Sequence, residues 1–145
     1  MKAKITWLNG RIFVGESGSG HSVIMDGAPE SGGRNTGFRP MEMMLLGLGG
    51  CTAFDVVMIL EKSREKVTAC EVSLEAERAS EDPKVFTHVK MIYTLKGHDL
   101  KPAAVERAIK LSADKYCSAS KMFEHTAKIE HEWKVESAQA TADNS

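Results

Sequence analysis

The sequence predicts a single α+β domain in which antiparallel sheets pack around a long apolar helix. Residues 3–8 and 11–15 alternate in polarity on either side of Asn9-Gly10, a dipeptide typical of a two-residue hairpin turn. Residues 41–63 form the most apolar segment of the chain and predict its main helix. Two further alternating segments, 67–79 and 84–96, are joined by a short turn-forming sequence and predict an antiparallel hairpin.

The composition is that of an ordinary globular protein without a strong charge bias. The 145 residues carry 19 Lys and Arg against 20 Asp and Glu, a formal net charge of -1, which disfavours a protein that binds nucleic acid or an anionic membrane electrostatically. Three cysteines are too few for a disulfide scaffold and favour a reducing compartment. The amino-terminal residues lack the pattern of a secretory signal, so we expect a cytoplasmic protein.

The order of the predicted elements defines the domain. A third strand, 21–25, precedes a loop rich in glycine and proline at 27–40, and the main helix follows. After the long hairpin, a second helix begins near Pro102 and is expected to end near Cys117. A last strand covers 127–135. We therefore expect one domain over residues 1–136 and a disordered tail over 137–145.

The main helix is apolar nearly all round, which implies protein on most of its sides. Asp55 lies in its interior, so a core helix is a better interpretation than a membrane span. A buried carboxylate needs a partner, which the sequence does not name. A chain of this size has little else to cover such a helix, and we expect a second copy of the chain to cover it in an obligate homodimer.

The three cysteines occupy different contexts. Cys70 shares a strand face with Val72 and Leu74 and is expected in the core. Cys51 follows a run of glycines and is either a small buried side chain or a reactive thiol. Cys117 is placed at a helix carboxyl end, where the helix dipole disfavours a thiolate, so it is a poor first nucleophile but could act as a resolving thiol. Spacing alone leaves a pairing between Cys51 and Cys117 open.

Residues 40–53, PMEMMLLGLGGCTA, together with Cys117 late in the chain, resemble the OsmC/Ohr family of thiol peroxidases. The resemblance implies an intertwined homodimer that reduces organic hydroperoxides with a peroxidatic Cys, a resolving Cys, an Arg and a Glu. Cys51 matches the peroxidatic position and Cys117 the resolving one. The resemblance further implies no bound cofactor, and a dithiol reductant that could be of the lipoyl type.

The chain departs from this family pattern at the Glu and the Arg. Met41 stands directly after Pro40, where the family commonly has Glu, and Glu42 comes one position later. Glu42 lies about 13 Å of helix rise from Cys51, so the two could meet only across a two-fold axis; alternatively, Glu42 is an ordinary first-turn carboxylate. The candidates for the Arg are Arg11, Arg34 and Arg39. Ser118 follows the second Cys, where the family often has Pro, and the departures together indicate a divergent branch.

Two other functional readings compete with the peroxidase. The chain could be a dimeric binding or stress protein that keeps the fold without efficient catalysis, as the displaced Glu suggests. Residues 47–50 could also be the GxxG loop of an RNA-binding domain, but they lie among apolar residues, which disfavours that reading. The histidines show no zinc-binding spacing, so no metal site is expected. His131 falls on the apolar face of the last strand and is expected to be a hydrogen-bonded core residue.

Overall fold

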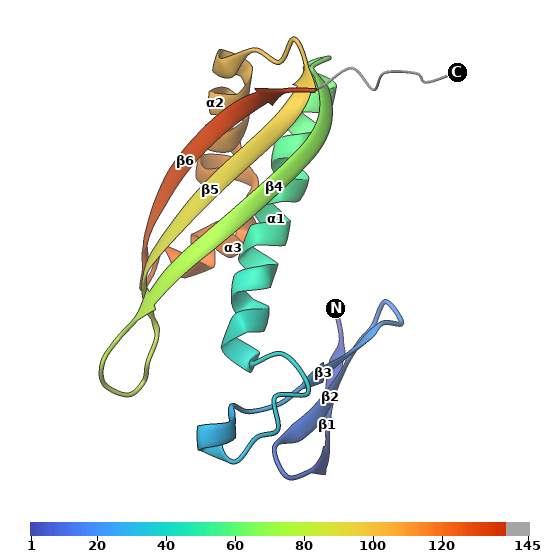
Figure 1. The fold of residues 1–145 in the computed structure, drawn as a ribbon, viewed down its shortest axis with the longest axis vertical. Coiled ribbons are helices and arrows are strands. Elements are labelled where there is room, and N and C mark those ends of the chain that lie inside the picture. Colours follow the sequence, from blue (N-terminus) through green and yellow to red (C-terminus); the bar gives the residue numbers. More distant parts are fainter. Residues whose placement is uncertain (139–145) are drawn as a thin grey trace. The chain divides into compact units, whose positions relative to one another are not determined.

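The computed structural model describes residues 1–138, which form two compact units, Met1–Leu46 and residues 47–138 (Figure 1). The expected disordered tail falls mainly on residues 139–145, which lie outside the described residues. Ser137 does not belong to a tail, because it is the last residue of a strand.

The amino-terminal unit contains a three-stranded antiparallel sheet of β1 (Ala3–Asn9), β2 (Ile12–Ser17) and β3 (Ser22–Met25), in that order. The expected Asn9-Gly10 turn is confirmed, since Asn9 pairs with Ile12 and Gly10 has a φ of 52°. A positive φ of this kind favours glycine. The Trp7 indole closes the turn by donating to the Gly10 carbonyl at 3.2 Å.

The loop after β3 contains one short 3-10 turn, Pro29–Ser31, and is organised by the Asp26 carboxylate. Asp26 is 2% exposed. It accepts hydrogen bonds from the Thr36 hydroxyl at 2.7 Å and from three backbone N–H groups, those of Gly27, Arg34 and Thr36. The Thr36 hydroxyl and these N–H groups outweigh the opposing effect of burial and lower the pKa of Asp26 to about 2.

Helix α1 (Pro40–Lys62) confirms the expected main helix and runs from the first unit into the second. Pro40 opens it, and the Glu42 carboxylate accepts a hydrogen bond from the Arg39 N–H at 2.9 Å, half of a capping box. Its length and composition would also suit a membrane span. Within the second unit, however, one of its faces is buried in the protein, as expected for a core helix; its buried residues there are Leu48, Gly49, Thr52, Asp55, Val56 and Leu60.

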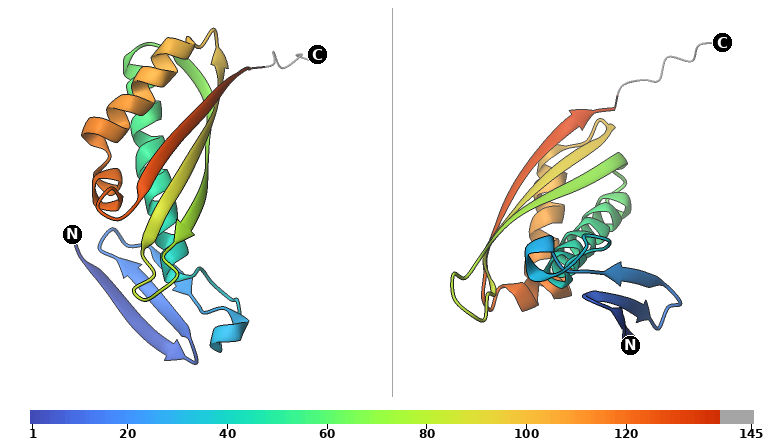
Figure 2. Two further views of the ribbon diagram at one scale, coloured as in Figure 1. Left: turned by 90° about the vertical axis from the view of Figure 1, so that its left-hand side faces the viewer. Right: turned by 60° about the horizontal axis from the view of Figure 1, so that its bottom comes forward.

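The second unit is a three-stranded sheet of β4 (Lys66–Arg78), β5 (Phe86–His98) and β6 (Lys128–Ser137), in that order. The helices lie on one face of this sheet (Figure 2). The predicted β4–β5 hairpin is confirmed as antiparallel, but the prediction of purely antiparallel sheets is wrong for β6, which pairs with β5 in parallel. The helices between β5 and β6 form a crossover that returns the chain to the end at which β5 began.

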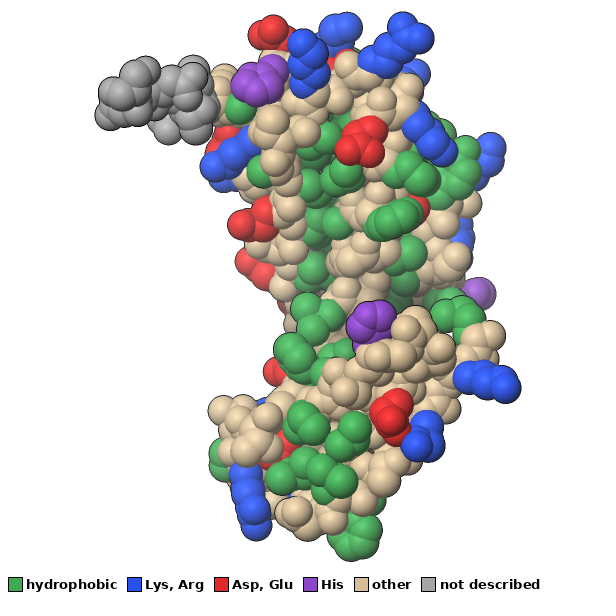
Figure 3. Space-filling model, turned by 90° about the vertical axis from the view of Figure 1, so that its right-hand side faces the viewer, with side chains coloured by type: hydrophobic (Ala, Val, Ile, Leu, Met, Phe, Trp, Pro, Cys, Tyr) green, Lys and Arg blue, Asp and Glu red, His purple; other side chains and the backbone are tan. Residues whose placement is uncertain are grey.

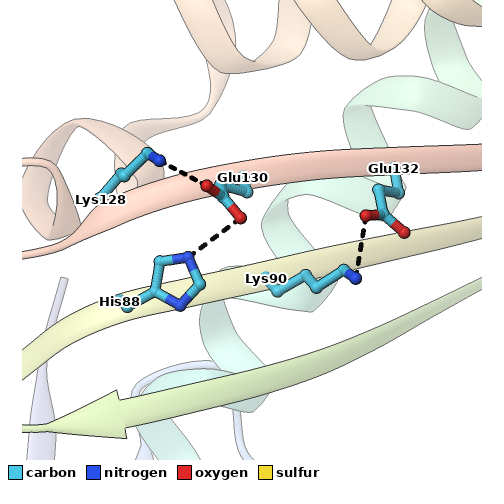
Figure 4. A network of polar contacts seen from close by, with 5 residues as sticks. All are labelled: His88, Lys90, Lys128, Glu130 and Glu132. Carbon is cyan, nitrogen blue, oxygen red and sulfur yellow. Dashed lines mark hydrogen bonds and ion pairs between the residues drawn. The ribbon is translucent and has the colours of Figure 1, made fainter.

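The two faces of this sheet differ in chemistry. The β5 residues Val89, Met91, Tyr93 and Leu95 are fully buried on the helical side. The opposite face carries polar contacts between β5 and β6, including His88–Glu130 at 3.2 Å and the Lys90–Glu132 ion pair at 2.9 Å (Figure 4). Such exposed pairs add little stability, but they mark this face as the solvent side.

The region after β5 differs most from expectation. Helix α2 (Pro102–Leu111) is followed by a π-helical turn, Ser112–Tyr116, and by a short helix α3 (Ser118–Phe123). The prediction of one helix ending near Cys117 merged these elements. Cys117 has the extended conformation, with ψ at 102°, and is the N-cap of α3. Cys117 is at the same time the C-cap of the π-helical turn, so the expectation that it lies at the carboxyl end of a helical segment is confirmed. Its second place, at the beginning of α3, was not expected.

Candidate active site

Three reactive side chains meet inside the second unit. Cys51 and Asp55 are four residues apart on α1 and project from the same face of the helix. Cys117 comes from the junction between the π-helical turn and α3. The two sulfur atoms and a carboxylate oxygen of Asp55 all lie within 4.8 Å of one another. Cys51 is half-buried and Cys117 is fully buried, so solvent reaches the cluster at Cys51.

The Cys117 sulfur sits among hydrogen-bonding groups. The Ser120 N–H donates to it at 3.3 Å, and the Thr52 hydroxyl lies 3.4 Å from it. Burial of the sulfur opposes ionisation, but the polar groups of Ser120 and Thr52, with a contribution from Cys51, outweigh it and lower the pKa of the Cys117 thiol. The environment thus favours a thiolate at Cys117, contrary to the expectation from sequence.

Cys51 has the opposite tendency. Burial is the main cause that raises the pKa of its thiol, and the Ala119 N–H opposes it. The neighbouring Cys117 and Asp55 also raise the pKa, so the net direction is upward. The pair therefore consists of the more accessible Cys51 thiol and the buried Cys117 sulfur, whose thiolate form the surrounding groups stabilise. Asp55 is 9% exposed, and the Ser112 hydroxyl donates to its Oδ2 at 3.1 Å. Ser112 is the partner that the sequence required for Asp55 but did not name.

A partly buried polar contact joins the Tyr93 hydroxyl and His131 Nδ1, which are 2.9 Å apart. Burial raises the pKa of Tyr93 and lowers the pKa of His131, so both are neutral near pH 7. The expectation that His131 makes a hydrogen bond is confirmed, but the residue is half-buried and does not belong to the fully buried core. Cys70 lies on the expected face of β4 with Val72 and Leu74, but it is half-buried and does not belong to the fully buried core.

Sequence reasoning missed the three hydroxyl residues around the site, Thr52, Ser112 and Ser120. Serine and threonine are common, and nothing in the positions of Thr52 and Ser112 distinguishes them. Ser120 has a weak local signal, because it lies three residues after Cys117 and a side chain at an N-cap position commonly accepts from the N–H three residues later.

The other predicted site residues belong to the amino-terminal unit, where each has a local role. The Arg11 Nε donates to the Ser31 carbonyl at 3.4 Å. The Arg39 guanidinium donates to the Asn35 side chain at 3.0 Å and to the Gly37 carbonyl at 3.1 Å. The exposed Arg34 contributes its N–H to Asp26. The roles predicted for Arg11, Arg34, Arg39 and Glu42 toward the thiols stay predictions.

A family model described as OsmC-like protein matches residues 32–132, which include the cluster. The chain belongs to the OsmC-like family. This result confirms the resemblance drawn from residues 40–53 and Cys117.

Individual relatives of this OsmC-like protein extend the comparison. Protein YhfA of Escherichia coli K12 is 48% identical over 138 residues, covering 95% of this chain and all of the relative. A hypothetical protein of Aquifex aeolicus has a solved structure with a TM-score of 0.83 and 25% identity, over 95% of this chain and 97% of its own. An organic hydroperoxide resistance protein of Legionella pneumophila has a TM-score of 0.69 at 15% identity, over 92% of this chain and 96% of its own, which shows a shared fold.

Proposed function

We propose that this OsmC-like protein is a thiol-dependent peroxidase that reduces organic hydroperoxides. The observation that carries the proposal is the proximity of the Cys51 and Cys117 sulfur atoms, which lie within 4.8 Å of each other. A disulfide requires the two sulfur atoms to approach to about 2.05 Å, and their proximity makes Cys51 and Cys117 the candidates for such a bond. Membership of the OsmC-like family and the fold shared with an organic hydroperoxide resistance protein support the same chemistry.

The reaction uses both sulfurs in sequence. The Cys51 thiolate attacks the terminal oxygen of the hydroperoxide, the O–O bond breaks, and the products are a sulfenic acid at Cys51 and an alcohol. The Cys117 thiolate then attacks the Cys51 sulfur, forming a disulfide and releasing water. In total two thiols lose two electrons and two protons to the peroxide. An external dithiol, which could be of the lipoyl type, restores the thiols.

Accessibility assigns the two roles. A hydroperoxide can approach the half-buried Cys51. Cys117 is fully buried and is suited to react with the oxidised sulfur of Cys51. An Arg from the amino-terminal unit would lower the pKa of Cys51 and orient the peroxide. The candidates for this role are Arg11 and Arg34, as the resemblance to the family suggests. Glu42 would hold that Arg.

The setting of the proposed enzyme follows from the same resemblance. We expect a homodimer in which a second copy covers the apolar surface of α1, working in the reducing cytoplasm in defence against organic hydroperoxides. The substrate is an apolar alkyl or fatty hydroperoxide, and the reaction needs no bound cofactor.

The decisive experiment is intact-mass analysis with peptide mapping after addition of one equivalent of cumene hydroperoxide to the reduced protein. We expect a loss of about two mass units, mapped to a Cys51–Cys117 bridge, because disulfide formation removes two hydrogen atoms. Cys51→Ser should abolish the bridge. Cys70→Ser is the matched control and should leave it intact, because Cys70 lies on β4 and is not part of the cluster.

Reduced thiols after this treatment, or oxidation that falls equally on Cys70, would contradict the peroxidase. That result would favour the alternative function, a dimeric binding or stress protein that has the OsmC fold without the catalytic activity.

A further inference from the structure

We propose that Cys51, Asp55 and Cys117 form a binding site for a zinc ion when both thiols are reduced. The proposal departs from the sequence, whose histidine spacing predicted no metal site. It is independent of the proposed peroxidase activity, because it concerns only the reduced side chains and their ability to hold a cation.

The geometry suits one small cation. Each of the three residues offers one ligand atom, and these atoms lie within 4.8 Å of one another. Zinc binds sulfur at about 2.3 Å, so two thiolates on one tetrahedral ion lie about 3.8 Å apart. The cluster is therefore at most about 1 Å wider than the bound arrangement, a difference that side-chain rotation can remove. Because Cys51 and Asp55 are one turn apart on α1, two of the ligands are held by a rigid helix.

The donor set selects the metal. Two thiolates and one carboxylate match the sulfur and oxygen ligands of zinc, whereas magnesium and calcium prefer oxygen alone. Three protein ligands leave a fourth tetrahedral position, which water can fill from the half-buried side at Cys51.

Neighbouring groups hold the ligands in place as is usual around a metal. The Ser112 hydroxyl donates to the Asp55 carboxylate, and the Ser120 N–H donates to the Cys117 sulfur. Second-sphere contacts of this kind orient ligands and tune affinity.

Metal binding and disulfide formation exclude each other, because each uses both sulfurs. In the zinc-bound protein, the two sulfurs would therefore be protected from disulfide formation. Its formation requires only Zn²⁺ and the loss of the thiol protons, with no oxidant or reductant.

The test uses the full-length, fully reduced protein and Co²⁺ as a spectroscopic probe for Zn²⁺. We expect one Co²⁺ per chain, with sulfur-to-cobalt charge-transfer absorption in the near ultraviolet and the visible bands of a tetrahedral ion. Added Zn²⁺ should displace the cobalt and remove both signals. Competition with a chromogenic chelator then gives the Zn²⁺ affinity.

Variants identify the ligands. Cys51→Ser, Cys117→Ser and Asp55→Asn should each weaken Zn²⁺ binding at least tenfold, and Cys70→Ser should bind like the wild type. Circular dichroism checks the fold of each variant. If Cys117→Ser does not fold because Cys117 is buried, Cys51→Ser and Asp55→Asn still test the proposal. Cys51 is half-buried, and asparagine has nearly the same shape as aspartate.

Absence of the charge-transfer band in the wild type would overturn the proposal, as would a band that depends on Cys70. Since no hydroperoxide is present, neither result bears on the peroxidase activity, which the mass measurement tests separately.

Discussion

At the scale of single residues, the Asp26 carboxylate makes more hydrogen bonds to the loop between β3 and α1 than any other described side chain. Its carboxylate accepts from residues up to ten positions further along the chain, and both of its oxygens are used. Each of these bonds is charge-assisted and therefore stronger than a bond to a neutral acceptor. A protonated Asp26 would have to give up part of this arrangement.

The depressed pKa of Asp26 gives a pH dependence with a definite sign. Its folded pKa of about 2 lies below the ordinary value of 3.8, so its contribution to stability is complete above about pH 4 and is lost as the pH falls toward 2. Asp26→Asn should lower the melting temperature by several degrees at pH 7. The difference from wild type should shrink between pH 4 and pH 2, as measured by thermal unfolding followed by circular dichroism.

Glu30→Gln is the matched control for this prediction. Glu30 is an exposed carboxylate in the same loop, and its replacement should leave the melting temperature unchanged across the pH range. A difference between Asp26→Asn and wild type that stays constant down to pH 2 would show that ionisation of Asp26 does not stabilise the fold.

At the scale of elements, the π-helical turn Ser112–Tyr116 determines the position of Cys117. It ends α2, the Cys117 N–H bonds back to the Ser112 carbonyl at 2.8 Å, and the chain then starts α3. Turns of this type occur frequently at functional sites. Here the turn brings Ser112 to Asp55 and Cys117 to Cys51, so it connects the chain after α2 to the middle of α1.

Ser112→Ala tests this connection. The change removes the only hydrogen bond that the described residues donate to the Asp55 side chain and leaves a nearly buried carboxylate without its donor. We expect the free energy of unfolding, measured by urea denaturation at pH 7, to fall by about 1–3 kcal/mol.

Ser118→Ala is the control for Ser112→Ala, because Ser118 is exposed at the first position of α3. It should change the free energy of unfolding by less than about 0.5 kcal/mol. Equal effects of the two substitutions would show that the bond from Ser112 to Asp55 contributes nothing specific.

At the scale of the whole molecule, α1 carries an apolar surface that one chain does not cover. Phe54 is 70% exposed, and with Met58 and Cys70 it lines a surface cavity of about 490 Å³. Figure 3 shows hydrophobic side chains on the side of the molecule that carries α1 and β4. An exposed apolar surface of this kind marks an interaction site, in agreement with the expected homodimer.

Phe54→Glu should therefore weaken dimerisation. Burying the introduced charge at an apolar interface costs more than 1.4 kcal/mol, so the dissociation constant should rise at least tenfold. Sedimentation velocity over a dilution series measures the change. Ser73→Glu is the control, because Ser73 points to the opposite face of β4 and should leave the dimer intact. A wild-type monomer, or a Phe54→Glu dimer of unchanged affinity, would contradict the prediction.

Features that depend on local periodicity were predictable from the sequence alone. Alternation identified the strands, because successive side chains of a strand point to opposite faces. The same rule placed Cys70 beside Val72 and Leu74, and His131 on the inner face of β6. The run of residues 40–53 identified the family and singled out Cys51 and Cys117.

Only the tertiary structure decided the direction of β6, the π-helical turn and the partners of the buried polar groups. The direction of β6 depends on where the intervening helices return the chain, which no local pattern encodes. Ser112 and Asp55 are 57 residues apart in sequence, and Thr52 and Cys117 are 65 apart. Such pairs form because packing the helices against one sheet brings distant segments together. The composition of the thiol site is therefore a property of the folded chain.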